Sequence, residues 1–241
     1  MLLRMPIIEK SLLRVALYWF KVQAGMAAKA VLSPSFKNEE IQHLLHGYWQ
    51  RYLRLRPEVP PMPTFGGLLM LHLAAMSAAF YQELTAMRET KDTATRSFYD
   101  IAWKVYKKMG GFSWWLASLR TGDPHRRLRI ATALFRAFPF NSPSYLWKDV
   151  QASAGIVAFD CLRCPVAEYF QSKGLSEFCT ETWCKLDFPL AELWHARLER
   201  AGTIASGAKV CDFRWKTDSA LSNMTKGETQ MARTPKEVIN S

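Results

Sequence analysis

The stretch AGIVAFDCLRC, residues 154–164, decides the fold class of this chain. It is short and rich in β-branched, aromatic and small apolar residues, which is typical of a β-strand. The 140 residues before it instead place apolar residues at helical spacing, and the change comes near Asn141. The stretch therefore begins a strand-containing region that follows a helical one.

Two short helices are expected directly after this strand. Residues 165–173 and 177–188 show helical character, and Gly174 lies between them. Pro189 bounds the second segment, because proline interrupts a helix.

Two further strands complete the C-terminal region. They are expected over residues 195–205 and 208–216, joined by a turn at Ser206-Gly207. Strands with intervening helices and a hairpin predict an α+β fold, in which a helical N-terminal region is followed by a small antiparallel sheet with short helices.

The first 140 residues predict a set of helices. Ile7, Leu12, Val15 and Trp19 recur at three- and four-residue spacing with charges between them, as in an amphipathic helix. Further helical segments are residues 39–55, 64–89, 93–109 and 126–138.

The longest uncharged run, residues 59–82, is long enough to cross a membrane. Pro60, Pro61 and Pro63 confine any helix in this run to the part from about Thr64 onward. We interpret the segment as a buried core helix and expect no integral membrane association.

Composition and charge narrow the classes of function. The 241 residues are 49% hydrophobic and 22% charged, which is typical of a globular protein with a substantial core. The formal net charge of +11 is compatible with an anionic partner. The basic residues are scattered and no recognised nucleic-acid motif accompanies them, so we expect a small anionic substrate and no nucleic-acid partner.

Three regions follow from these patterns. Residues 1–140 form the helical region, residues 141–216 form the α+β region, and residues 217–241 form a tail without periodicity that we expect to be disordered. The first twenty residues carry four charges where a secretory signal would be apolar, so we expect a cytoplasmic protein. The sequence predicts no particular oligomeric state.

All five cysteines lie in the last third of the chain. An odd number argues against a disulfide framework and leaves packing, metal binding and reactivity as explanations. Packing suits Cys161 and Cys179, because cysteine behaves as a small apolar residue. The C-x₂-C at Cys161 and Cys164 and the C-x₄-C at Cys179 and Cys184 loosely resemble a zinc site. We expect no cofactor, with zinc or another divalent metal as the alternative.

Cys164 and Cys184 have the surroundings of reactive thiols. Cys164 precedes Pro165, which favours the first position of a helix, so Cys164 is expected at the N-cap. There, backbone N–H groups and the helix dipole would lower the pKa of its thiol. Cys184 and Asp187 are three residues apart, which places a thiol and a carboxylate on the same helical face.

The last strand alternates its side chains between two faces. Cys211 is expected on one face with two aromatic residues, and Asp212 and Arg214 are expected on the other. The simplest explanation of Asp212 and Arg214 is that they pair on a solvated face. The small residues over 201–206 indicate that another group approaches closely, so Cys211 and Asp212 are also candidate site residues.

Several short motifs in this region resemble the C-terminal signature of the L-2-amino-thiazoline-4-carboxylic acid hydrolase family. The resemblance extends over about residues 160–215. The residues that carry it are Cys164-Pro165, Gly174, Cys184-x-x-Asp187, Thr203, Gly207 and Cys211-Asp212-Phe213. It implies a hydrolase that opens a small heterocyclic ring, as 2-aminothiazoline-4-carboxylate is opened to a carbamoyl-cysteine on the way to L-cysteine. The chain adds Cys161, Cys179 and a basic tail to this pattern.

The chemistry of ring opening gives the candidate residues their roles. Hydrolysis needs an activated water or thiolate and a proton donor for the leaving group. Cys164 or Cys184 is the candidate nucleophile, and Asp187 or Asp212 is the candidate proton carrier, with Cys211 in the same catalytic set.

A positive group is also needed for the substrate carboxylate. Arg163, His195 and Arg214 are the candidates for this contact. A water activated by a metal on the same cysteines and aspartates is the mechanistic alternative to a thiolate.

Two other classes of protein stay open. One is a non-catalytic module in which the cysteines hold zinc or a small ligand. The other is a membrane-surface protein that docks through its basic N-terminal helix.

Overall fold

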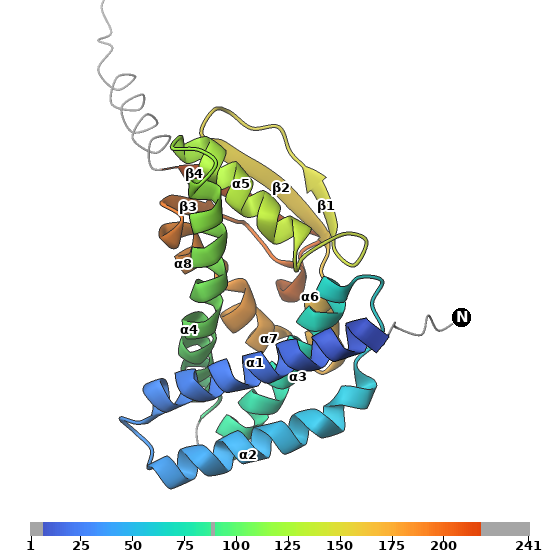
Figure 1. The fold of residues 1–241 in the computed structure, drawn as a ribbon, viewed down its shortest axis with the longest axis vertical. Coiled ribbons are helices and arrows are strands. Elements are labelled where there is room, and N and C mark those ends of the chain that lie inside the picture. Colours follow the sequence, from blue (N-terminus) through green and yellow to red (C-terminus); the bar gives the residue numbers. More distant parts are fainter. Residues whose placement is uncertain (1–6, 88–89, 218–241) are drawn as a thin grey trace, which may run out of the picture.

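The computed structural model of the chain describes residues 7–87 and 90–217. It confirms the expected α+β fold, with long helices in the N-terminal part and a small antiparallel sheet in the C-terminal part (Figure 1). From residue 218 onward, the predicted tail lies outside the described residues. The helices before the sheet are α1 (Ile7–Leu32), α2 (Asn38–Leu55), α3 (Phe65–Ala86), α4 (Lys91–Ser118) and α5 (Pro124–Ala137), with a 3-10 turn η1 (Arg56–Glu58) after α2.

Helix α3 is the buried core helix that the sequence predicts after the prolines. The Thr64 hydroxyl accepts a hydrogen bond from the Gly67 N–H and lies 2.7 Å from the Ser144 hydroxyl, which fixes the start of the helix. In the described part of the chain, only this helix is long and apolar enough to cross a membrane, and 83% of its most apolar window is buried inside the protein. Burial on all sides explains its apolar composition.

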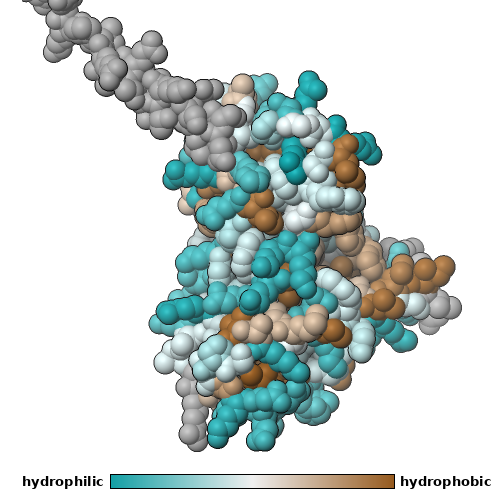
Figure 2. Space-filling model, turned by 60° about the vertical axis from the view of Figure 1, so that its left-hand side comes forward, coloured by the Kyte–Doolittle hydropathy of each residue, from teal (hydrophilic) through white to brown (hydrophobic). Residues whose placement is uncertain are grey.

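Helix α1 has two apolar faces, and the face that the periodicity singled out points away from the core. Val15 is 69% exposed and Leu12 is 55% exposed, whereas Leu13 and Leu17 are buried. Helix α1 packs against α3 and α4 through this second face. Figure 2 shows one side of the molecule, on which hydrophobic residues interrupt a largely hydrophilic surface.

The sheet has four antiparallel strands in the order β1-β2-β4-β3. The stretch that opened the sequence analysis forms β2 at its centre, and Cys161 of β2 pairs with Cys211 of β4. Helix α5 contacts β2 and β4. The strands are β1 (Leu146–Asp149), β2 (Ile156–Arg163), β3 (Ala196–Glu199) and β4 (Cys211–Thr217).

The expected strand over 195–205 is wrong after its first half. Strand β3 ends at Glu199, and the chain leaves the sheet before a 3-10 turn η3 (Ile204–Ser206). The backbone N–H groups of Ala201 and Gly202 bind the Asp212 carboxylate at 3.0 Å instead of a neighbouring strand. A loop, and not a two-residue turn, therefore joins β3 to β4.

The expected helix over 177–188 is divided into three pieces. These are α7 (Ser176–Cys179), a single π-helical turn η2 (Thr180–Cys184) and α8 (Asp187–Leu193). Pro189 lies inside the first turn of α8 and does not end it, because an N–H at that position has no partner within a helix. The preceding helix α6 (Pro165–Ser172) agrees with its prediction to within one residue.

The two predicted regions share a cluster of buried hydrophobic side chains. One cluster of buried side chains joins Leu71 and Phe80 of α3 to Cys161, Phe170 and Phe178 of the C-terminal region. The sheet and its short helices therefore pack directly on the long helices.

Candidate active site

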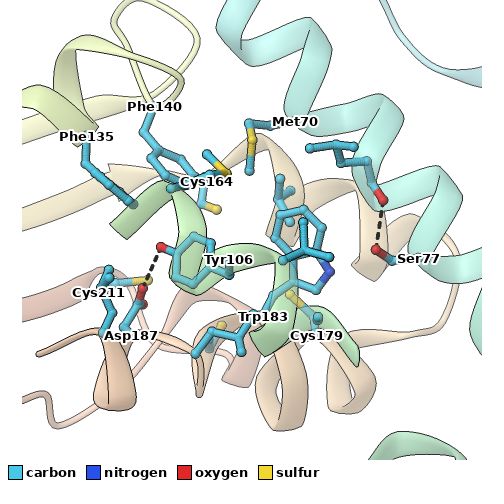
Figure 3. Close-up of a pocket in the computed structure, with 18 of the residues that line it drawn as sticks. Met70, Ser77, Tyr106, Phe135, Phe140, Cys164, Cys179, Trp183, Asp187 and Cys211 are labelled. Carbon is cyan, nitrogen blue, oxygen red and sulfur yellow. Dashed lines mark hydrogen bonds between the residues drawn. The ribbon is translucent and has the colours of Figure 1, made fainter. Parts of the chain in front are cut away.

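All five cysteines line one cavity of about 230 Å³ between the sheet and the helices. Figure 3 labels three of them, Cys164, Cys179 and Cys211. Cys161 and Cys211 lie on neighbouring strands, and Cys164 lies where β2 meets α6. Cys179 ends α7 and Cys184 ends the π-helical turn. None is in a disulfide. Segments that are up to 50 residues apart therefore bring their thiols to one place.

A buried ion pair lies beside the thiols. Arg200 Nη1 lies 2.8 Å from Asp187 Oδ2, and the two side chains are 4% and 18% exposed. Arg200 Nη2 donates to the Cys184 carbonyl at 2.7 Å, and the Tyr106 hydroxyl donates to Asp187 Oδ1 at 3.3 Å. The rings of Phe188 and Phe213 each lie 5.2 Å from the guanidinium. A charge buried this deeply needs such partners to offset the hydration that it loses.

Burial and pairing perturb the titration of these three groups. Burial raises the pKa of Asp187 above its usual range, and the contacts with Arg200 and Tyr106 only partly offset this. Burial alone would lower the pKa of Arg200, but the Asp187 carboxylate raises it, so Arg200 stays charged. Burial, followed by the Asp187 carboxylate, raises the pKa of Tyr106, so its hydroxyl stays protonated.

Cys184 is the thiol that ionises most readily. A hydrogen bond from the Cys179 thiol lowers the pKa of Cys184, and the nearby Arg200 lowers it further against the effect of burial. The same hydrogen bond, together with burial, raises the pKa of Cys179. The two pKa values therefore move in opposite directions, and Cys184 is the thiol of this pair that loses its proton first.

The low pKa expected for Cys164 is wrong. Cys164 is the N-cap residue of α6, as the sequence predicts, but burial raises the pKa of its thiol well above the usual value. The cost of desolvating a thiolate exceeds what the start of a short helix supplies. Burial also raises the pKa of Cys161, and it raises that of Cys211 to about 11.

Two predicted residues of the last strand lie outside the cavity lining. The alternation is as predicted, with Cys211, Phe213 and Trp215 facing the cavity. Asp212 points the other way, where its carboxylate binds the loop that carries Arg200. Burial alone would raise the pKa of Asp212, but the hydrogen bonds from the backbone of Ala201 and Gly202 together lower it. Arg214 pairs with Asp160 at 2.8 Å.

The other two candidates for the substrate carboxylate also lie outside the lining. Arg163 pairs with Glu168 at 3.0 Å on the surface. His195 is exposed, has a backbone φ of 51°, and packs against the Trp114 ring. The side chains that the sequence proposed for this contact therefore do not line the cavity, and Arg200 is the cation next to Cys184.

Sequence reasoning missed Arg200 and Tyr106. The signal for Arg200 was local, because a charged residue directly before the small residues Ala201-Gly202 marks the point where the strand leaves the sheet. Tyr106 comes from α4, 81 residues from Asp187 in the sequence, and it has no motif of its own.

The described residues provide no set of ligands for the zinc site that the cysteine spacing suggested. Within residues 7–87 and 90–217, no three His, Cys, Asp or Glu side chains are grouped so that they could hold a metal ion. The Cys161 thiol instead donates to the Arg163 carbonyl at 3.1 Å, and Cys211 accepts from the Ile204 N–H at 3.2 Å.

Comparison with known families gives one match. The model of the family described as L-2-amino-thiazoline-4-carboxylic acid hydrolase matches residues 70–215. The matched span contains all five cysteines and the Arg200, Asp187 and Tyr106 side chains. No curated protein and no solved structure matches the chain.

Proposed function

Because the chain belongs to the L-2-amino-thiazoline-4-carboxylic acid hydrolase family, we propose that it opens a heterocyclic ring of the cyclic amidine or thiazoline kind by hydrolysis of a C–N or C–S bond. The observation that carries this proposal is the low-pKa thiol of Cys184 next to the buried Arg200–Asp187 pair in one cavity. A thiolate, a carboxylate and a protonated phenol are the groups that such a reaction needs.

The first step forms a bond between the Cys184 sulfur and the ring carbon between two heteroatoms. The C–N or C–S bond of the ring breaks, and the leaving atom takes a proton. Tyr106 is the donor in this proposal, because its protonated hydroxyl lies in the cavity and donates to Asp187. Arg200 stabilises negative charge near the sulfur and the carboxylate.

The second step releases the product. Water adds to the same carbon, and Cys184 leaves as a thiolate. Asp187 accepts one proton of the water and passes it to the oxygen of Tyr106, which gave up its own proton in the first step. The second proton of the water passes to a nitrogen of the product. The raised pKa of Asp187 suits a group that takes up a proton and gives it back, because a base is most effective when its pKa lies near the working pH. The sum of the two steps is one water consumed and one ring bond hydrolysed.

The test is ring opening by the pure protein with cyclic amidines, hydantoins and thiazolines as substrates. Cys184→Ala should lower kcat at least about 10³-fold, since it removes the bond-forming atom. Cys179→Ala should have a smaller effect, through the pKa of Cys184. Arg163→Ala and His195→Ala lie outside the cavity and serve as controls with unchanged rates. Equal rates in wild type and Cys184→Ala would refute the nucleophile.

A non-catalytic ligand-binding module is the second candidate, because the cavity alone would suffice for binding. It predicts ligand binding without turnover and no loss of binding in Cys184→Ala. The zinc version of this candidate predicts near-stoichiometric metal in protein purified without chelator, and loss of folding when the cysteines are changed.

A further inference from the structure

The cavity extends far beyond the thiols and the ion pair. It continues between α1, α2, α3 and α4, where Phe20, Tyr48, Met70 and Phe98 line it. In Figure 3, Asp187 and Tyr106 lie on one side of the space and Met70 and Ser77 on the other. We call the part between the four helices the apolar arm.

The apolar arm has far fewer charged side chains than the end of the cavity that holds Cys184 and the Arg200–Asp187 pair. The charged residues in the lining are Arg136, Asp187 and Arg200, and none of them comes from α1 to α4. Arg136 is already paired with Asp149 at 2.6 Å. The one hydroxyl that α3 offers, on Ser77, donates back to the Leu73 carbonyl at 2.8 Å. Polar groups of a ligand would therefore lose their water in the arm without replacement.

The size of the cavity also exceeds what a five-membered ring needs. An apolar cavity of about 150 Å³ is large enough for a benzene molecule. The cavity here measures about 230 Å³, so a small ring at the thiols would leave the arm empty. Filling it with carbon instead would gain apolar burial and dispersion contacts.

Four polar atoms of the lining still lack a hydrogen-bond partner among the described residues. They are the hydroxyls of Tyr48 and Tyr145 and the indole N–H groups of Trp183 and Trp215. Tyr48, Tyr145 and Trp215 are each at most 3% exposed. Each of these atoms is fully covered by protein, so none of them is an open donor for a ligand in the cavity.

We propose that this cavity takes a heterocycle with an apolar acyl or aryl substituent, which fills the apolar arm. Its occupant is larger and more apolar than 2-aminothiazoline-4-carboxylate itself. The claim that this ligand is the substrate rests on the proposed function. The claim that it binds in the cavity does not.

The experiment compares 2-aminothiazoline-4-carboxylate with its 2-acetylamino, 2-butanoylamino and 2-hexanoylamino derivatives. Kd is measured by calorimetry, and ring opening is measured separately on the same compounds. Each added CH₂ should lower Kd about fourfold, which is the gain from burying one methylene.

Two variants locate the substituent in the apolar arm. Ala102→Phe fills the arm from α4 and should reduce the ratio of Kd between acetyl and hexanoyl compounds to about one. Met70→Ala widens it and should move the tightest binding to a longer chain, which keeps the test valid if the first variant does not fold. Ala30→Phe, on the exposed side of α1, is the matched control and should keep the wild-type ratio.

Binding and turnover separate the two proposals. A Kd that does not change with chain length, or no binding of the hexanoyl compound, overturns the apolar arm even if the parent ring is opened. Tighter binding with chain length but no ring opening of any compound supports the arm and overturns the hydrolase.

Discussion

Arg200 and Asp187 are the residues on which the site depends most, because each is buried and each is the main partner of the other. Arg200 is 4% exposed, so its charge has almost no access to water. Its contacts also tie the β3–β4 loop to Cys184. The pair therefore contributes both to the stability of the fold and to the position of the thiol.

Asp187→Asn tests this double role. We expect a loss of about 3 kcal/mol in the free energy of unfolding, since the substitution leaves the Arg200 charge buried without its counterion. Turnover should fall at least 100-fold, because the proposed base is gone. Glu168→Gln breaks an exposed pair and should cost less than about 1 kcal/mol. Equal stability of the two variants in urea unfolding would contradict the buried pair.

His72 supplies a test of burial that does not involve the cavity. Burial, and to a smaller extent Arg56, lowers the pKa of His72 to about 4 from 6.5, and its Nδ1 lies 3.1 Å from the Tyr52 hydroxyl. The folded pKa lies below the unfolded one, so the unfolded chain binds a proton first as the pH falls. The free energy of unfolding therefore decreases as the pH falls from about 6.5 to about 4, and His72 does not change it above that window.

The expected size of this effect is a loss of about 2–3 kcal/mol from pH 7 to pH 4.5. His72→Gln should lose less stability than wild type over the same interval by about that amount. Urea unfolding of both proteins at the two pH values measures the difference. Parallel losses in the two proteins would show that His72 takes up its proton equally in both states.

Individual site residues were predictable from the sequence only where local spacing decides. Cys184 and Asp187 are three residues apart, and the alternation of β4 separated Cys211 from Asp212, although only the structure shows that the Cys211 face lines the cavity. Cys164 was located correctly at its N-cap, but its pKa depends on how much protein covers the sulfur. Segments that are distant in the sequence bury this sulfur. The contact between Tyr106 and Asp187 likewise joins two distant segments.

At the scale of elements, helix α1 shows what periodicity leaves undecided. Its sequence has apolar residues on two faces, and only the packing against α3 and α4 selects Leu13 and Leu17 for the core. The β3–β4 connection shows the same limit, because the Asp212 carboxylate replaces the expected ladder hydrogen bonds. In both cases a contact from another element overrides a local pattern.

A pair of substitutions in α1 tests which face is buried. Leu17→Glu places a charge among buried side chains and should cost at least about 3 kcal/mol in the free energy of unfolding. Val15→Glu introduces the same charge at a side chain that is 69% exposed and should stay within about 0.5 kcal/mol of wild type. The reverse order of stabilities would place the other face of α1 against the core.

At the scale of the whole molecule, the cavity is a product of the complete fold. Strands β2 and β4 supply Cys161 and Cys211, the short helices supply the other thiols, and the long helices close the space from the opposite side. The α+β class could be predicted from the change of pattern near residue 141. The packing of the sheet and the helices around the cavity could not be predicted, because it depends on contacts between segments that are far apart in the sequence.

Alkylation with iodoacetamide at pH 7, followed by mass spectrometry of the peptides, tests most directly whether Cys184 is the reactive thiol of a shared cavity. We predict that Cys184 is modified first and that ring opening is lost in proportion to its modification, because its pKa is lowered while those of the other four cysteines are raised. Slow and uniform labelling of all five cysteines, or full activity after complete modification of Cys184, would contradict the account.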